Sequence, residues 1–254
     1  MKSLTIIFLA STTLTIGFYP QKAENINHRV LVSMNTKSMK DKSNHGPVRI
    51  LPLGDSITQA DKSHNSYRRP LWHMLKESGY DIDFVGSLTK NHLGGPPNPD
   101  FDLNHEGHWG WRADEIIKGR FFRGRLSKWL KKYTPDIVLM HLGTNDVLQG
   151  KSISSTLDEL QLIIDILRVE NPNVTILIAK LIPLYDPAGN ILINRLNEEI
   201  PRLVSVKDSP ESRVLAVDHN SNFDAKEDTY DGAHPNPVGE MKMAQKWFDI
   251  IESL

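Results

Sequence analysis

Short apolar runs alternate with helix-like patterns along the chain from Val48 onward. Five runs are rich in β-branched residues and almost continuously apolar, as is typical of strands covered on both faces. They span residues 48–53, 82–85, 137–142, 174–179 and 214–217. The pattern therefore predicts five buried strands.

Between these runs, apolar residues recur at the three- and four-residue spacing of amphipathic helices. The spacing predicts a helix over 67–78, a helical stretch over 113–132 with a break near 119–124, a helix carrying Leu157 to Leu167, and a C-terminal helix carrying Met241 to Ile251. Strands separated by helices imply right-handed crossovers and a parallel sheet between helices. We expect an α/β fold, a three-layer α/β/α sandwich with a central five-stranded parallel sheet.

The first residues have the character of an export signal rather than of a folded segment. Lys2 precedes an uncharged, mostly apolar run from Leu4 to Phe18, which is too short for the roughly 20 residues of a membrane span. We expect a signal peptide over 1–23, a flexible polar leader over 24–46 and one domain over 47–254. The expected location is secreted or periplasmic, and an uncleaved N-terminal anchor is the alternative.

Composition narrows the function classes. The 254 residues carry 30 basic and 31 acidic side chains, so nothing global favours a nucleic-acid partner. The chain has no cysteine, which excludes disulfides, cysteine-based metal sites and a thiol nucleophile. No later stretch is apolar enough for an integral membrane domain, and the oligomeric state is left open.

Polar, glycine-containing clusters follow the predicted strands, at the sheet edge where chemistry sits in such folds. They are GDSIT at 54–58, GTND at 143–146 and DGAH at 231–234. Ser56 follows a buried strand, where its hydroxyl and nearby backbone N–H groups suit a nucleophile that generates an oxyanion. A helix or turn cap is an equally good explanation of Ser56 alone.

Asp231 and His234 are three residues apart, so the carboxylate can orient the imidazole toward a serine. Asn145 and Gly110 are candidate oxyanion donors, as a fixed side-chain amide and as a backbone N–H that a substrate can approach closely. Taken separately, each of these residues is also common in surface turns.

The order of the blocks is more informative than any one of them. GDSIT, the glycine of HEGHWGW at 105–111, GTND and DGAH together resemble the four blocks of SGNH (GDSL-type) hydrolases. HEGHWGW, the Ser66-Tyr67-Arg68 segment and HLGTND are similar to carbohydrate esterase family 3, which includes acetyl xylan esterases. The resemblance covers essentially all of residues 47–254 and implies the flavodoxin-like SGNH hydrolase fold.

The resemblance implies a role for each matched residue. Ser56 is the expected nucleophile, His234 the base and Asp231 its partner. The Ser56 and Gly110 N–H groups and the Asn145 amide are the expected oxyanion hole, and Gly110 is preferred to Gly107 because a helical pattern begins near Ala113. The scheme requires no cofactor and no metal.

The implied activity is removal of acetyl or other short acyl groups from a carbohydrate, such as acetylated xylan. Trp109 and Trp111 flank Gly110, and an indole face can stack on a sugar ring. Their alternation indicates that only one of them faces a cleft. Tyr67 and Arg112 are further candidates for substrate binding, and packing explains each of these residues equally well.

Other polar residues of the blocks have structural interpretations. Asp55 and Asp146 are expected to bond nearby backbone and fix the active loops. His141, inside an apolar strand, is expected to be a core histidine whose hydrogen bonds are satisfied.

Three alternatives remain open on the sequence. One is an esterase or thioesterase of the same fold acting on a non-carbohydrate ester. Another is a metal-dependent deacetylase using His105 and His108, although the two glycines of HEGHWGW favour a loop over a helical zinc motif. The third is a non-catalytic sugar-binding protein, which would not need all four blocks.

Overall fold

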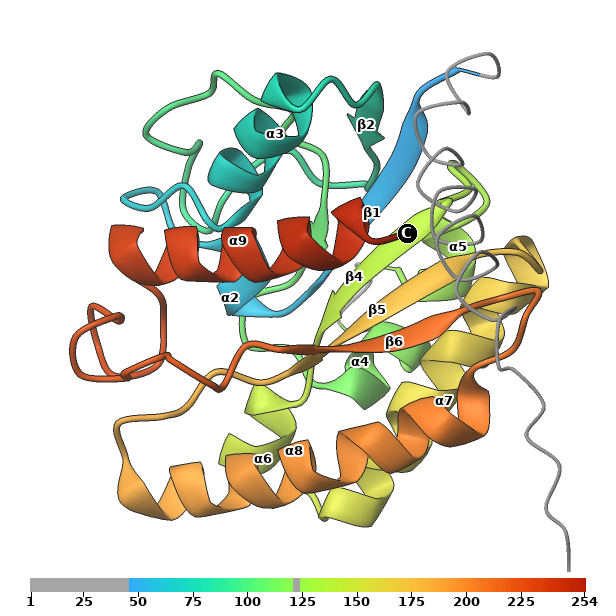
Figure 1. The fold of residues 1–254 in the computed structure, drawn as a ribbon. Helices are drawn as coiled ribbons and strands as arrows, with labels where there is room; N and C mark the ends of the chain where they lie inside the picture. Colours follow the sequence, from blue (N-terminus) through green and yellow to red (C-terminus); the bar gives the residue numbers. More distant parts are fainter. Residues whose placement is uncertain (1–45, 121–123) are drawn as a thin grey trace, which may run out of the picture. The chain divides into compact units, whose positions relative to one another are not determined.

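The computed structural model describes residues 46–120 and 124–254 (Figure 1). The predicted signal peptide and the leader up to residue 45 lie outside the described residues. Within the described part of the chain, no helix is long and apolar enough to cross a membrane.

A parallel sheet forms the centre of the fold, with strand order β2-β1-β4-β5-β6. These strands are β1 (Val48–Gly54), β2 (Ile82–Phe84), β4 (Ile137–His141), β5 (Thr175–Lys180) and β6 (Val214–Asp218). Each matches one of the five predicted apolar runs to within a few residues. A sixth short strand, β3 (Glu106–Gly107), pairs with the end of β1 and was not predicted.

Helices cover both faces of this sheet, which confirms the predicted sandwich (Figure 1). Side chains alternate along β1, so that Ile50 packs with α3 (Arg68–Glu77) and α9 (Pro237–Glu252). Leu51 belongs to the core of the opposite face, with α4 (Ala113–Lys118), α5 (Leu126–Trp129), α7 (Ile153–Glu170) and part of α8 (Pro187–Lys207). Two short helices, α2 (Ser56–Gln59) and α6 (Thr144–Leu148), follow β1 and β4 directly.

The helix α8 was not predicted from the sequence. Pro201 lies inside it, and Ile191 and Val206 are exposed, so its apolar pattern is irregular. Asp186 caps its start by accepting a hydrogen bond from the N–H of Gly189. The buried Ile193, Leu196 and Ile200 hold the helix against the rest of the fold.

Candidate active site

Ser56 is the first residue of α2, just beyond the carboxyl end of the strand β1. Asp55 caps this helix, because its Oδ1 accepts a hydrogen bond of 2.9 Å from the N–H of Ile57. Gly54 is needed for the tight turn: a Cβ there would lie 2.1 Å from Thr58 Oγ1 and 2.7 Å from the His141 carbonyl oxygen. The local sequence thus turns the chain sharply and fixes the serine at the sheet edge.

A hydrogen-bonded chain joins Ser56, His234 and Asp231. His234 Nε2 lies 2.8 Å from Ser56 Oγ, and His234 Nδ1 lies 2.7 Å from Asp231 Oδ2. The other carboxylate oxygen of Asp231 accepts from the backbone N–H groups of Ala233 and His234. Burial raises the pKa of Asp231, but these bonds outweigh it and hold the pKa below its usual range. The carboxylate is therefore charged at neutral pH and orients the imidazole.

The two glycines of HEGHWGW differ in what their N–H groups can reach. The Gly107 N–H donates to His105 Nδ1 at 2.9 Å, so it is already engaged. Gly110 has a φ of +75°, and a Cβ there would meet nothing within 4 Å. The Gly110 carbonyl oxygen accepts a hydrogen bond of 3.1 Å from the side-chain amide of Gln149. The preference for Gly110 is consistent with this arrangement.

Asn145 is linked to the nucleophile's turn through Asp55. Asn145 Nδ2 donates to Asp55 Oδ2 at 3.3 Å, which places the amide beside the turn that carries Ser56. Burial raises the pKa of Asp55 to about 7, against the lowering effect of its bond from Ile57. Asp55 thus bonds both the backbone and Asn145, as expected of a residue that fixes the loop.

Asp146 connects the Asn145 turn to the loop that carries Gly110. Its carboxylate accepts the N–H of Ala113 at 3.1 and 3.3 Å, which confirms the expected backbone role. Burial raises its pKa to about 6. Ala113 begins α4 just after Gly110, and Asp146 follows Asn145 directly. The bond between them therefore links the two loops that carry the candidate oxyanion donors.

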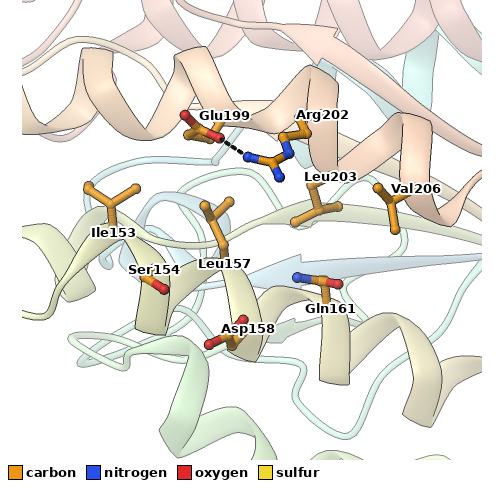
Figure 2. Close-up of a pocket in the computed structure, with 9 residues that line it drawn as sticks. All are labelled: Ile153, Ser154, Leu157, Asp158, Gln161, Glu199, Arg202, Leu203 and Val206. Carbon is orange, nitrogen blue, oxygen red and sulfur yellow. Dashed lines mark ion pairs between the residues drawn. The ribbon is translucent and has the colours of Figure 1, made fainter.

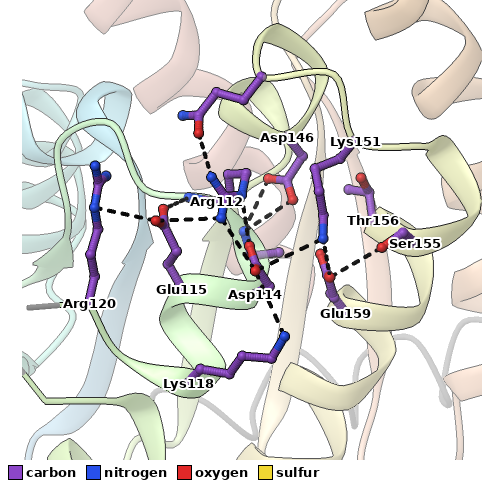
Figure 3. Close-up of polar contacts among 12 residues, drawn as sticks. Arg112, Asp114, Glu115, Lys118, Arg120, Asp146, Lys151, Ser155, Thr156 and Glu159 are labelled. Carbon is purple, nitrogen blue, oxygen red and sulfur yellow. Dashed lines mark hydrogen bonds and ion pairs between the residues drawn. The ribbon is translucent and has the colours of Figure 1, made fainter.

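A charged network surrounds Asp146 (Figure 3). Within the described ranges, Asp114, Asp146 and Glu159 present carboxylate oxygens within 4.8 Å of one another. The Lys151 ammonium lies 2.8 Å from Glu159 and 4.0 Å from Asp114, and Arg112 pairs with Asp114 at 2.9 Å. This chain's own cations therefore compensate the acidic cluster.

The four predicted substrate-binding residues differ in how deeply they are buried. Trp111 is 3% exposed and packs on His108 and Trp129 in the core. Tyr67 is 1% exposed and its hydroxyl bonds Thr58 Oγ1 at 3.1 Å. Their prediction as substrate-binding residues was wrong, because buried rings cannot contact a bound sugar.

Trp109 and Arg112 are half-buried. The Trp109 ring is stacked on His92 and on His234, at centroid distances of 4.4 and 4.8 Å. Arg112 is bound to Asp114 and to Gln149 Oε1. Their contact with substrate stays a prediction.

His105 and His108 are the possible metal ligands of the deacetylase alternative. The His105 and His108 rings bond separate partners: His105 bonds the Gly107 N–H and the Lys90 carbonyl, and His108 bonds Glu106 at 2.9 Å. They belong to no metal-ligating cluster of the described residues.

His141 is fully buried, as expected, but neither ring nitrogen has a partner in the described part of the chain. The expectation that its hydrogen bonds are satisfied finds no support among the described residues.

Sequence reasoning missed three residues beside Ser56 and His234. These residues are Asp61, His64 and Tyr230, and His64 and Tyr230 line a small hollow together with Ser56 and His234. The Asp-x-x-His spacing of 61–64, which repeats that of 231–234, was a signal that could have identified the first two.

A larger cavity of about 510 Å³ lies between α7 and α8 (Figure 2). Leu157 and Leu203 face it from the two helices, and Glu199 and Arg202 form an ion pair at its edge. None of the Ser56, Asp231 or His234 side chains lines it. Ser56 and His234 therefore line the small hollow and not this cavity.

Comparison with known proteins identifies the family. The GDSL-like Lipase/Acylhydrolase family pattern matches residues 53–241. A multidomain esterase of Ruminococcus flavefaciens is 33% identical over an alignment of 227 residues that covers 82% of this chain and 29% of that protein. The chain thus spans less than a third of the length of that relative.

Solved structures of carbohydrate esterase family 3 are similar throughout the domain. The protein from Talaromyces cellulolyticus is 30% identical with a TM-score of 0.69, over 80% of this chain and 96% of its own. A family 3 carbohydrate esterase from Clostridium thermocellum is 32% identical with a TM-score of 0.67, over 80% and 94%. This chain belongs to the GDSL-like lipase/acylhydrolase family, also called the SGNH hydrolases.

Proposed function

We propose that this protein removes acetyl groups from a carbohydrate, with Ser56, His234 and Asp231 as its catalytic triad. The observation that carries the proposal is the continuous chain from Ser56 Oγ through both ring nitrogens of His234 to Asp231, with bonds of 2.8 and 2.7 Å. A serine is a weak nucleophile unless a positioned base takes its proton, and this arrangement supplies one.

In the acylation step, His234 Nε2 takes the hydroxyl proton as Ser56 Oγ attacks the ester carbonyl. The charged Asp231 stabilises the imidazolium and keeps its second N–H in place. His234 then gives the proton to the departing alcohol oxygen, and the acetyl group stays on Ser56. A water molecule, deprotonated by the same imidazole, releases acetate and regenerates the serine.

The oxyanion would be received by the N–H groups of Ser56 and Gly110 and by the Asn145 amide. The first N–H groups of a helix have no intrahelical acceptor, so that of Ser56 is available at the start of α2. The contacts of Asp55 with Asn145 and of Asp146 with Ala113 support a fixed geometry. Fixed donors stabilise the developing charge without reorganising.

The substrate proposal rests on the site and on the relatives together. Within the described residues, the hollow beside Ser56 has a volume of only about 10 Å³, and Ser56, His64 and His234 are among the residues that line it. Hydrogen-bonding groups this close to Ser56 favour a polar alcohol over a lipid. The similar proteins named as an acetyl esterase and as family 3 carbohydrate esterases favour an acetylated carbohydrate, for which we propose acetylated xylan or a related glycan.

The same likeness leaves a second ester class to be tested. A short-chain esterase or thioesterase acting on a non-carbohydrate substrate would use an identical triad, because fold and triad do not set the leaving group.

We also propose that residues 1–23 direct export, since the proposed substrate is a polymeric glycan outside the cell.

Acetate release from a panel of acetylated polysaccharides, beside 4-nitrophenyl esters of increasing chain length, tests the proposal. We expect acetate from acetylated xylan and a kcat/KM that falls from acetyl to octanoyl. The Ser56→Ala variant should release none while unfolding at the same temperature. A higher kcat/KM for the octanoyl ester, or undiminished hydrolysis by Ser56→Ala, would overturn it.

A further inference from the structure

A second carboxylate–imidazole pair lies beside the proposed triad and repeats its local geometry. Asp61 Oδ1 lies 2.8 Å from His64 Nδ1 and accepts the Ser63 N–H at 2.8 Å. Asp231 accepts the corresponding bonds with two oxygens, Oδ2 for His234 Nδ1 and Oδ1 for the Ala233 N–H. Both pairs are Asp-x-x-His turns in which the carboxylate orients the ring of the histidine three residues later.

The second histidine reaches the same hollow as the nucleophile. His64 lines it together with Ser56 and His234. Tyr230 stands between the two imidazoles in a series of ring contacts: it stacks on His64 at 4.0 Å and on His234 at 5.7 Å. These ring contacts link the Asp61–His64 pair to the imidazole of His234, the proposed catalytic base.

A buried framework holds the segment that carries this pair. The Asn91 amide donates to the carbonyl oxygens of Asp61 and His64, and the buried Arg68 donates to Asn91 Oδ1. The segment is bounded by two non-glycine residues of positive φ, Ala60 at 57° and Ser66 at 67°. Such conformations persist only where surrounding structure enforces them, and they cluster at ligand-binding sites.

The hydrogen bond to Asp61 engages one ring nitrogen of His64. Burial raises the pKa of Asp61, but the bonds from His64 and Ser63 outweigh it and lower the pKa below its usual range. The Asp61 carboxylate accepts from Nδ1, so Nε2 is the ring nitrogen left to bond a ligand hydroxyl. Within residues 46–120 and 124–254, no group donates a hydrogen bond to this Nε2.

The hollow adjoins the proposed base, and two of the three proposed oxyanion donors do not line it. It includes His234, which must return its proton to the leaving oxygen, and it includes neither Gly110 nor Asn145. Its volume of about 10 Å³ suits one water-sized group. A hydroxyl carried by the alcohol part of the substrate has that size and supplies the missing donor.

We propose that His64, oriented by Asp61, binds a sugar hydroxyl adjacent to the ester and so determines specificity for acetylated carbohydrates that keep a neighbouring free hydroxyl. This inference rests on the proposed function. It places His64 against the alcohol part of the substrate, whereas the triad acts on the acyl part.

Two matched substrates test the proposal: methyl 2-O-acetyl-xylopyranoside, which keeps free hydroxyls, and its 2,3,4-tri-O-acetyl counterpart, which has none. We define the preference as kcat/KM for the first divided by kcat/KM for the second. His64→Phe keeps a ring to stack on Tyr230 but loses the acceptor, so the preference should fall about threefold to tenfold, mainly through KM.

His64→Gln, which retains an acceptor, should restore part of the preference, and Asp61→Asn should reduce it by freeing the tautomer of His64. Lys62→Ala, an exposed change within the same turn, is the matched control and should keep the wild-type preference. Thermal unfolding of each variant establishes that it is folded, and His64→Gln and Asp61→Asn carry the test if His64→Phe does not fold.

An unchanged preference in His64→Phe and Asp61→Asn would overturn the inference while leaving the triad intact. An equal loss on both substrates would also overturn it, because His64 would then only support His234. If the wild-type protein hydrolyses neither substrate and no 4-nitrophenyl acetate, the proposed function fails, and the inference fails with it.

Discussion

The indole of Trp109 is stacked on the imidazole of His234, with centroids 4.8 Å apart and planes inclined by 13°. The same indole stacks on His92. A residue that the sequence predicts as a sugar platform thus contacts the proposed catalytic base. Its stacking restrains the ring that must shuttle a proton between Ser56 and the leaving group.

Replacing Trp109 should therefore lower turnover even on a substrate without a sugar. For 4-nitrophenyl acetate we expect Trp109→Ala to reduce kcat about threefold to tenfold, since an aromatic pair contributes about 0.5–1.5 kcal/mol. Trp109→Phe, which keeps a stacking ring, should lose less. Equal kcat values for both variants and the wild type would exclude this contribution.

Asn145→Ala removes a proposed oxyanion donor. We expect kcat to fall by on the order of a hundredfold, with KM changed much less, because the donor acts on charge that develops in the transition state. Steady-state kinetics on 4-nitrophenyl acetate measure the split. A rise in KM at constant kcat would instead assign Asn145 to ground-state binding.

The buried imidazole of His141 should make stability sensitive to acid. Burial lowers its pKa to about 4, whereas an exposed histidine in the unfolded chain titrates near 6.5. The folded state therefore binds fewer protons between these values. The contribution of His141 to stability is complete above pH 6.5 and is lost as the pH falls toward 4, by up to about 3 kcal/mol.

His141→Leu should flatten that dependence. Urea unfolding of both proteins from pH 7.5 to 4.5 measures the difference in the free energy of unfolding, which should move in favour of the variant as the pH falls. Comparing the two proteins cancels the titration of groups that do not interact with His141. Burial and the charge of His141 lower the pKa of the neighbouring His219, so His219→Leu is measured beside His141→Leu to separate the two histidines. A difference that is constant with pH would contradict the assignment.

Lys151→Met should destabilise the network of Figure 3. The variant leaves Asp114, Asp146 and Glu159 without the ammonium between them, so like charges face one another in a partly buried site. We expect a melting temperature a few degrees lower at pH 7.5 and a smaller deficit at pH 5, where Asp146 is protonated. An equal deficit at both pH values would argue against charge repulsion as the cause.

The sequence predicts the sheet well because its strands are buried on both faces and read as uninterrupted apolar runs. The helix α8 escaped prediction because Pro201 and the exposed Ile191 and Val206 blur its apolar stripe. The strand β3 escaped because two residues that pair with β1 leave no periodic signal.

The candidate triad was predictable because short motifs carry its residues in a recognisable order. The directions of individual side chains were not. Tyr67 and Trp111 have the chemistry of sugar-binding residues, yet tertiary packing buries both rings. His64 was overlooked because only the folded chain brings its turn beside His234, which lies 170 residues later.

The central claim is that His234 activates the hydroxyl of Ser56, and covalent capture tests it most directly. The protein is incubated with a fluorophosphonate, digested and examined by mass spectrometry. We predict one phosphonyl group on the peptide that contains Ser56, and labelling slowed by orders of magnitude in His234→Ala. Labelling at another residue, or at Ser56 with an undiminished rate in the variant, would contradict the account.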